Sequence, residues 1–93
     1  MAKIIWTNKS IKDLRLINDY ISIDSKLYAT RFINRLVNRV DQLIKFSESG
    51  RVVPEKEDPT IRELIEGNYR IFYKLQRRNV IILRIHHSAK SIK

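Results

Sequence analysis

The C-terminal third of the chain gathers side chains that could act on a phosphate group: Arg70, His86, His87 and Lys90. A guanidinium can hold a phosphate through two parallel hydrogen bonds, and an imidazole with a pKa near ~6.5 exchanges protons at neutral pH. Cleavage of a phosphodiester without a metal needs an acid, a base and a stabilising cation. Because neighbouring strand residues point to opposite faces, at most one of the two histidines can join such a site.

Each of these groups also has a structural interpretation. Arg70 can pair with Glu63 or Glu66 across a hairpin, and this interpretation stands level with a functional one. The second histidine is expected to be packed or solvated. Helical spacing favours a solvated helix face for three arginines, Arg31, Arg35 and Arg39. We expect the aromatic residues Trp6, Tyr69 and Tyr73 to lie in the core.

The composition is that of a small folded protein. A chain of 93 residues is long enough for one hydrophobic core, so we expect a single domain over 1–93. A hydrophobic share of 43% argues against disorder despite a net charge of +9. With 0 Cys and 2 His, disulfides and zinc–thiolate sites are excluded, and we expect neither a metal nor a cofactor.

Charge is unevenly distributed along the chain. All 10 acidic residues lie at or before Glu66, and only basic charges follow it: Arg70, Lys74, Arg77, Arg78, Arg84, Lys90 and Lys93. This pattern predicts a positive surface that attracts phosphate backbones, acidic protein segments or anionic surfaces. Apolar runs such as Val80 to Leu83 are far shorter than the ~20 residues of a membrane span, so we expect a soluble, cytoplasmic protein without a membrane partner.

Two helices are expected in the first half. After a short strand over 3–7, Thr7 or Asn8 can cap a helix with two apolar stripes, Ile11, Leu14, Ile17 and Ile21 on one and Leu16, Tyr20 and Ile23 on the other. Asp24 or Ser25 can cap a second helix, whose apolar residues from Ala29 to Ile44 keep helical spacing. That helix is expected to end before Ser49-Gly50.

Strands are expected in the second half. Residues 47–60 hold both prolines and read as an irregular connection. Alternating strands follow over 61–66 and 69–75, joined at Gly67-Asn68, and an apolar strand over 80–87 ends the pattern. The order is β-α-α-β-β-β, which favours an α+β fold with a two-helix hairpin on a small, mostly antiparallel sheet.

The ordered motifs resemble the RelE/ParE superfamily of type II toxin–antitoxin toxins. They are Trp6-Thr7, Ser49-Gly50-Arg51-Val52-Val53-Pro54-Glu55, Ile61-Arg62-Glu63-Leu64-Ile65, Gly67-Asn68-Tyr69-Arg70-Ile71-Phe72-Tyr73 and Ile82-Leu83-Arg84-Ile85-His86-His87-Ser88-Ala89-Lys90. The resemblance covers nearly the whole chain and implies the same β-α-α-β-β-β fold. It also implies a small toxin neutralised by a cognate antitoxin.

Two branches of the superfamily have different targets, as the resemblance implies. RelE-like members enter the ribosome and cut mRNA, whereas ParE-like members poison DNA gyrase; the segments from Ser49 to Glu55 and from Arg62 to Ile65 look more like ParE. If the chain is a ribonuclease, its catalytic residues would be Arg70, His87 (or His86) and Lys90. No Tyr or Phe follows Tyr73, however, although ribonuclease-branch toxins commonly carry a late aromatic. The ribonuclease site therefore looks incomplete.

Three functional classes are open, in this order: a gyrase poison, an mRNA endoribonuclease, and a binding module that contacts only an antitoxin. The antitoxin is expected to place an acidic segment on the helices and the basic sheet, with Leu16, Tyr20, Ile23 and Arg84 as contacts. Substitution Arg70→Ala is expected to remove toxicity and to leave the fold intact.

Overall fold

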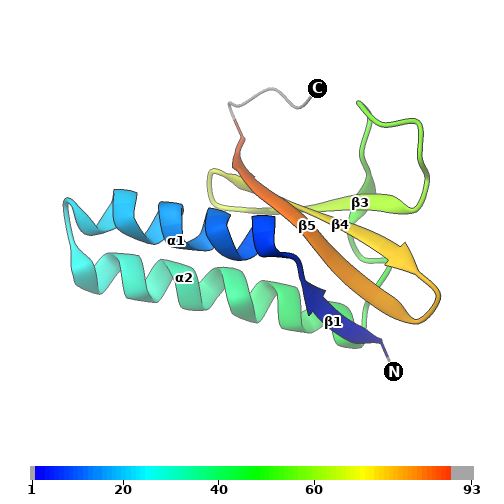
Figure 1. Cartoon of the computed structure of the whole chain (residues 1–93), viewed down its shortest axis with the longest axis horizontal. Helices are drawn as coiled ribbons and strands as arrows, with labels where there is room; N and C mark the ends of the chain where they lie inside the picture. The colour runs from blue at the N-terminus through cyan, green and yellow to red at the C-terminus, as the bar shows by residue number, and fades with distance from the viewer. Residues whose placement is uncertain (1, 89–93) are drawn as a thin grey trace.

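The computed structural model describes residues 2–88, in which a helical hairpin lies on one face of a sheet (Figure 1). Its elements are β1 (Lys3–Trp6), α1 (Asn8–Ser22), α2 (Lys26–Asp41), the 3₁₀ turn η1 (Gln42–Ile44), β2 (Arg51–Val52), β3 (Ile61–Glu66), β4 (Tyr69–Gln76) and β5 (Asn79–His87). The expected α+β fold and its element order are confirmed, with one additional short strand. Within residues 2–88, neither helix combines the length and apolarity needed to cross a bilayer.

The sheet has the strand order β1-β5-β4-β3-β2. β1 pairs with β5 in parallel, and the other pairs are antiparallel, so the expectation of a mostly antiparallel sheet is confirmed. Residues 47–60 were expected to be irregular, but β2 lies within them and pairs Arg51 with Glu63 and Val52 with Arg62. A strand of two residues is too short to show an alternating pattern, which is why the sequence missed it.

Both helices begin where the capping residues predict. Thr7 Oγ1 accepts a hydrogen bond from Ser10 N at 3.1 Å and donates one to the carbonyl of Ile82 at 2.7 Å, so the cap also ties α1 to β5. Ser25 Oγ accepts from Tyr28 N at 3.0 Å at the start of α2. α2 ends at Asp41 and continues as η1, several residues before the expected end at Ser49-Gly50.

The core lies between the helical hairpin and the inner face of the sheet. α1 and α2 contribute Ile17, Phe32, Leu36 and Val40, and the strands contribute Leu64, Ile71, Tyr73, Val80, Ile82 and Ile85. Tyr73 is fully buried, as its position beside Ile71 predicted, while Trp6 and Tyr69 pack at the margin of this core. The opposite face of the sheet carries Arg70, Phe72 and His86.

Gly50 holds the start of the β2–β3 region against the sheet. Tyr73 Oη accepts a hydrogen bond from Gly50 N and donates one to the carbonyl of Ser47, both at 2.9 Å. A Cβ at Gly50 would lie 2.5 Å from Tyr73 Oη and 2.6 Å from the carbonyl oxygen of Glu63. Only glycine fits this close approach of the backbone to β3.

Candidate functional site

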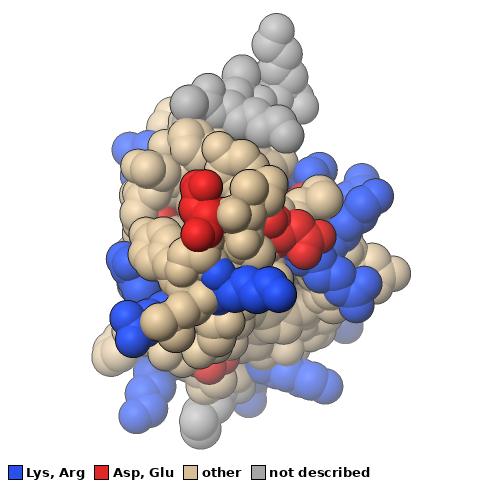
Figure 2. Space-filling model, turned by 90° about the vertical axis from the view of Figure 1, so that its left-hand side faces the viewer, with Lys and Arg blue, Asp and Glu red and all other residues tan. Residues whose placement is uncertain are grey.

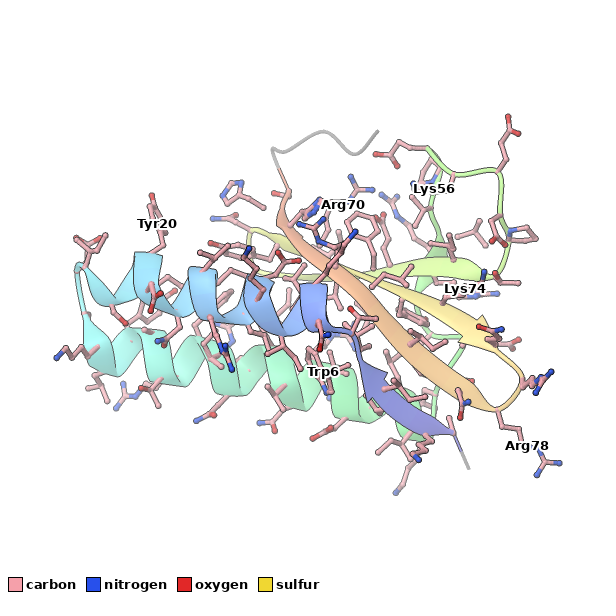
Figure 3. All side chains as sticks on the ribbon, in the orientation of Figure 1. Trp6, Tyr20, Lys56, Arg70, Lys74 and Arg78 are labelled. Atoms are coloured by element: carbon pink, nitrogen blue, oxygen red, sulfur yellow. The ribbon has the colours of Figure 1, made fainter. Side chains whose placement is uncertain are left out.

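The sheet face away from the helices carries the arginine singled out from the sequence. Arg70 in β4 lies opposite Ile65 in β3 and His86 in β5. Its neighbours Ile71 and Tyr69 pack toward the helices, so the side chain of Arg70 points to the outer face by strand alternation. The labelled side chain is seen above the sheet in Figure 3.

Arg70 belongs to an ion-pair cluster with Arg51, Glu55 and Glu63, called here the Arg70 cluster. Its Nε donates to Glu63 Oε2 at 2.7 Å, and its Nη1 and Nη2 donate to the two oxygens of Glu55 at 2.9 and 3.0 Å. Glu63 also accepts from Arg51 Nε at 2.5 Å. The Arg70 and Glu63 side chains are 10% and 0% exposed, so they depend on one another for polar partners.

The Arg70 cluster is electrically balanced, because two guanidinium groups face two carboxylates. The hydrogen bonds from Arg70 lower the pKa of Glu55. The pKa of Arg70 is raised by its hydrogen bond to Glu55, against the opposing effect of burial. Both groups are therefore charged at neutral pH, and the guanidinium also lies over the Phe72 ring at 4.8 Å. Of the two partners considered from the sequence, Glu63 pairs with Arg70 and Glu66 does not.

The candidate ribonuclease residues are divided between the two faces of the sheet. His86 packs edge-on against Phe72 on the outer face, with ring centroids 5.7 Å apart. His87 packs against Tyr69 at 5.3 Å, and Tyr69 packs on Phe32 of α2, so His87 faces the helices. The structure thus places Arg70 and His87 on opposite faces, and Lys90 lies outside the described residues. Among residues 2–88, no group of His, Asp and Glu side chains is arranged to hold a metal ion.

Two basic residues of the second half, Arg84 and Lys74, have acidic partners that the sequence did not reveal. Arg84 Nε donates to Asp13 Oδ2 at 2.8 Å, and the same carboxylate oxygen accepts from Ile85 N at 2.9 Å. Lys74 lies 3.7 Å from Asp58. With Arg70 also paired, the expected run of unbalanced positive charge is corrected at these residues: their counter-charges come from distant parts of the chain.

The arginines of α2 are not simply a solvated face. Arg35 Nη2 pairs with Glu66 Oε2 at 2.7 Å, and Arg39 Nε lies 3.8 Å from the other oxygen of Glu66. Glu66 follows Leu64 on the inner side of β3, so these pairs link α2 to the end of β3. Arg31 and Arg35 are exposed, as a solvated helix face predicts, and at Arg35 and Arg39 the structure adds a helix–sheet contact that the sequence did not indicate.

The second apolar stripe of α1 is exposed, as its place outside the core stripe predicted. Leu16, Tyr20 and Ile23 are 56%, 71% and 80% exposed, and we call them with Leu27 and Tyr28 the hairpin surface. Figure 3 shows Tyr20 pointing away from α2. Figure 2 looks at this end of the molecule and shows uncharged surface around acidic groups near the centre, with a basic side chain directly below them and further Lys and Arg side chains toward the margins.

Leu27 and Tyr28 were missed as surface contacts by the sequence reasoning. Both precede the core stripe of α2 that begins at Ala29, and this position outside the stripe was the available signal. Beside the hairpin surface lies an open hollow of about 590 Å³ that reaches from the two helices to the β3–β4 turn; it is lined by aromatic and polar side chains that include Tyr20, Tyr28, Phe32, Arg35, Tyr69 and His87.

Comparisons with known proteins identify a family and a relative that match nearly the whole chain. Residues 4–92 match the family described as the ParE toxin of the type II toxin–antitoxin system parDE. The chain is 37% identical to Toxin RelE2 of Caulobacter vibrioides over 91 residues, which cover 97% of this chain and 99% of that one.

Two solved structures share the fold. The chromosomal ParDE toxin–antitoxin system from P. aeruginosa superposes with a TM-score of 0.76 at 26% identity, covering 94% of this chain and 96% of that one. The toxin–antitoxin complex RelBE2 from Mycobacterium tuberculosis has a TM-score of 0.68 at 19% identity, over 92% and 96% of the two chains, and supports the fold alone.

Proposed function

The chain belongs to the ParE family of type II toxin–antitoxin toxins, and from this premise we propose that it inhibits DNA gyrase by binding it. A cognate antitoxin neutralises the toxin. The observation that carries the choice of gyrase is the pairing of Arg70. Both edges of its guanidinium are occupied by Glu55 and Glu63, so no edge is presented to a scissile phosphate.

The positions of Arg70 and His87 also support a binding function over ribonuclease chemistry. A ribonuclease needs its acid, base and phosphate-binding group within hydrogen-bond reach of one another. Arg70 and His87 lie on opposite faces of the sheet. A gyrase poison needs only a complementary surface.

The antitoxin is proposed to cover the hairpin surface. Asp13, Leu16, Tyr20 and Ile23 follow one stripe of α1 at helical spacing, and Asp13 joins this stripe to Arg84 of β5. The proposed footprint therefore runs from exposed apolar side chains to a guanidinium that is 41% exposed. An antitoxin segment that carries both apolar and acidic side chains would complement this footprint.

The alternative function is that of a RelE-like endoribonuclease. The name of the Caulobacter vibrioides relative favours it, and so does the position of His86, which lies on the same face of the sheet as Arg70. For this site to act, Arg70 would first have to exchange Glu55 for a phosphate of the RNA.

Induced expression in growing cells tests the proposal. Gyrase poisoning predicts that the DNA-damage response rises before the incorporation of labelled amino acids falls. A His86→Ala/His87→Ala variant serves as the matched control and is expected to remain folded and toxic, because binding gyrase needs neither imidazole. Early arrest of translation with cleaved mRNA, lost in this variant, would establish the ribonuclease instead.

A further inference from the structure

The two carboxylates of the Arg70 cluster are held very differently. Glu63 lies in β3, is 0% exposed and pairs with both arginines. Glu55 lies between β2 and β3, where the backbone forms neither helix nor strand, and its side chain is 40% exposed. Figure 3 shows the segment that carries Lys56, the next residue, on the same side of the sheet as Arg70. Glu63 is thus a fixed part of the cluster, and Glu55 is the partner that can leave.

A hollow is already present where Glu55 meets Arg70. It has a volume of about 340 Å³, is open to solvent, and is lined by Arg51, Pro54, Glu55, Ile65, Arg70 and Ser88. Ile65 is 49% exposed there, so the wall beside the guanidinium is apolar. An incoming side chain therefore finds an apolar contact and a charged group in one place.

Removal of Glu55 would leave an unbalanced site. Arg51, Arg70 and Glu63 would remain with a net charge of +1. Nη1 of Arg70 would lose its acceptor, and Nη2 would keep only its contact with Glu63 Oε2. A buried guanidinium with one unsatisfied edge and an excess positive charge is unfavourable, so the site would bind an anion in place of Glu55. We propose that Glu55 is an intramolecular ligand that closes a carboxylate-binding site at Arg70, and that an acidic side chain of a protein partner replaces it.

Geometry and charge balance together favour a carboxylate over a phosphate dianion. Nη1 and Nη2 reach the two oxygens of Glu55 at 2.9 and 3.0 Å, which is the bidentate arrangement of a guanidinium with one carboxylate. A singly charged carboxylate restores the neutrality of the cluster, whereas a phosphate dianion such as inorganic phosphate or a phosphorylated side chain leaves a net negative charge next to the fully buried Glu63. The inference does not require gyrase as the target, because the toxin alone carries the site. It is compatible with the gyrase proposal as long as Glu55 or a partner carboxylate, and not a phosphate, occupies the guanidinium.

Acetate titration of the purified protein tests the site directly. The Glu55→Gln variant is titrated with sodium acetate at constant ionic strength, and binding is followed by the NMR signal of the Arg70 Nε–H group. While an intramolecular ligand occupies the site, a competitor cannot bind, so the apparent affinity for the competitor equals the intrinsic affinity multiplied by the fraction of time that the site is open. We therefore expect Glu55→Gln to bind acetate about tenfold or more tightly than the wild-type protein.

The matched control is Asp58→Asn. It removes one negative charge from the same segment, but Asp58 bonds to Thr60 and Lys74 and not to Arg70. Asp58→Asn is expected to bind acetate as the wild-type protein does. Equal affinity in Glu55→Gln and wild type would overturn the inference, and so would an equal gain in Asp58→Asn, which would show a general charge effect.

Two further arms complete the test. Adding Arg70→Lys to Glu55→Gln removes the bidentate fork and should abolish the gain in acetate affinity. This variant lacks the Arg70 Nε–H group, so acetate binding is followed in all variants also by the backbone amide signals of Arg51 and Ser88, which line the same hollow. Phosphate is titrated in parallel, and tighter binding of phosphate than of acetate would contradict a carboxylate site. If the Glu55 variant does not fold, the wild-type protein still decides the question: its Arg70 Nε–H signal should respond to high acetate and not to chloride, and the absence of any response would refute the site.

Discussion

Arg70 is reached by carboxylates from two different parts of the chain. Glu63 faces it across the β3–β4 hairpin, a pairing that strand alternation made foreseeable. Glu55 comes from a segment whose residue pattern predicts no regular structure, so nothing in the sequence indicated that it would bind the same guanidinium. The sequence could therefore identify Arg70 as important without choosing between a structural and a functional role.

Substitution Arg70→Ala is expected to destabilise the protein. It leaves the Glu63 carboxylate fully buried with only Arg51 as a partner, and breaking such a buried pair costs about 3 kcal/mol of unfolding free energy. This replaces the sequence-based expectation that the fold stays intact. Urea denaturation measures the loss, with Arg78→Ala at the exposed β4–β5 turn as the control expected to match the wild type. An Arg70→Ala protein as stable as the control would contradict the buried pairing.

The lowered pKa of Glu55 predicts a defined acid sensitivity. Because the folded pKa lies below the ordinary value of 4.5, the pair with Arg70 contributes stability above about that pH, and this contribution is lost as the pH falls through the folded pKa. The stability difference between wild type and Glu55→Gln should therefore be largest at neutral pH and shrink below pH 4.5. Denaturation curves across this range measure it, and a difference that does not change with pH would contradict the ion pair.

At the scale of the elements, hydrophobic spacing and capping residues predicted both helices and the three long strands. The patterns failed where an element is too short or is decided by a distant contact. β2 has only two residues and exists because it pairs with β3. α2 ends at Asp41 although apolar residues continue to Ile44, because the chain tightens into η1 there.

Gly50, before β2, and Gly67, after β3, are each expected to resist substitution by alanine, but for different reasons. Gly50→Ala places a methyl group against Tyr73 Oη and the Glu63 carbonyl, and overpacking with the loss of the Tyr73 hydrogen bonds should cost about 3 kcal/mol. Gly67→Ala meets a backbone φ of +58°, which costs about 1–2 kcal/mol for an alanine. Thermal unfolding compares them, and a Gly50→Ala variant more stable than Gly67→Ala would refute the close approach at Gly50.

The hairpin surface should bind the antitoxin without contributing to stability. Tyr20→Ala/Ile23→Ser should weaken binding of the purified antitoxin by about tenfold or more, because exposed apolar anchors dominate helix-mediated recognition. The unfolding free energy should change by less than about 0.5 kcal/mol. Phe46→Ser is the matched control: Phe46 is 64% exposed but follows η1, away from the hairpin surface. Calorimetric titration measures the affinities, and equal losses in both variants would disprove the assigned footprint.

At the scale of the whole molecule, the net charge is +9, but within residues 2–88 three of the basic side chains expected on a positive surface are paired with carboxylates. Arg70 pairs with Glu55 and Glu63, Lys74 pairs with Asp58, and Arg84 pairs with Asp13. The described residues thus offer a sheet face with internally balanced charge and a helical end with exposed apolar side chains. These features suit a molecule that binds other proteins. The sequence predicted the fold better than it predicted this distribution of charge, because the ion pairs join residues that are far apart along the chain.

The gyrase proposal is tested most directly with purified components. Toxin added to DNA gyrase, ATP and relaxed plasmid should block negative supercoiling or trap cleaved gyrase–DNA complexes, and an equimolar amount of antitoxin should prevent the effect. The same toxin added to translating ribosomes should leave the mRNA intact. Unimpaired supercoiling together with mRNA cleavage at the ribosome would contradict the proposal.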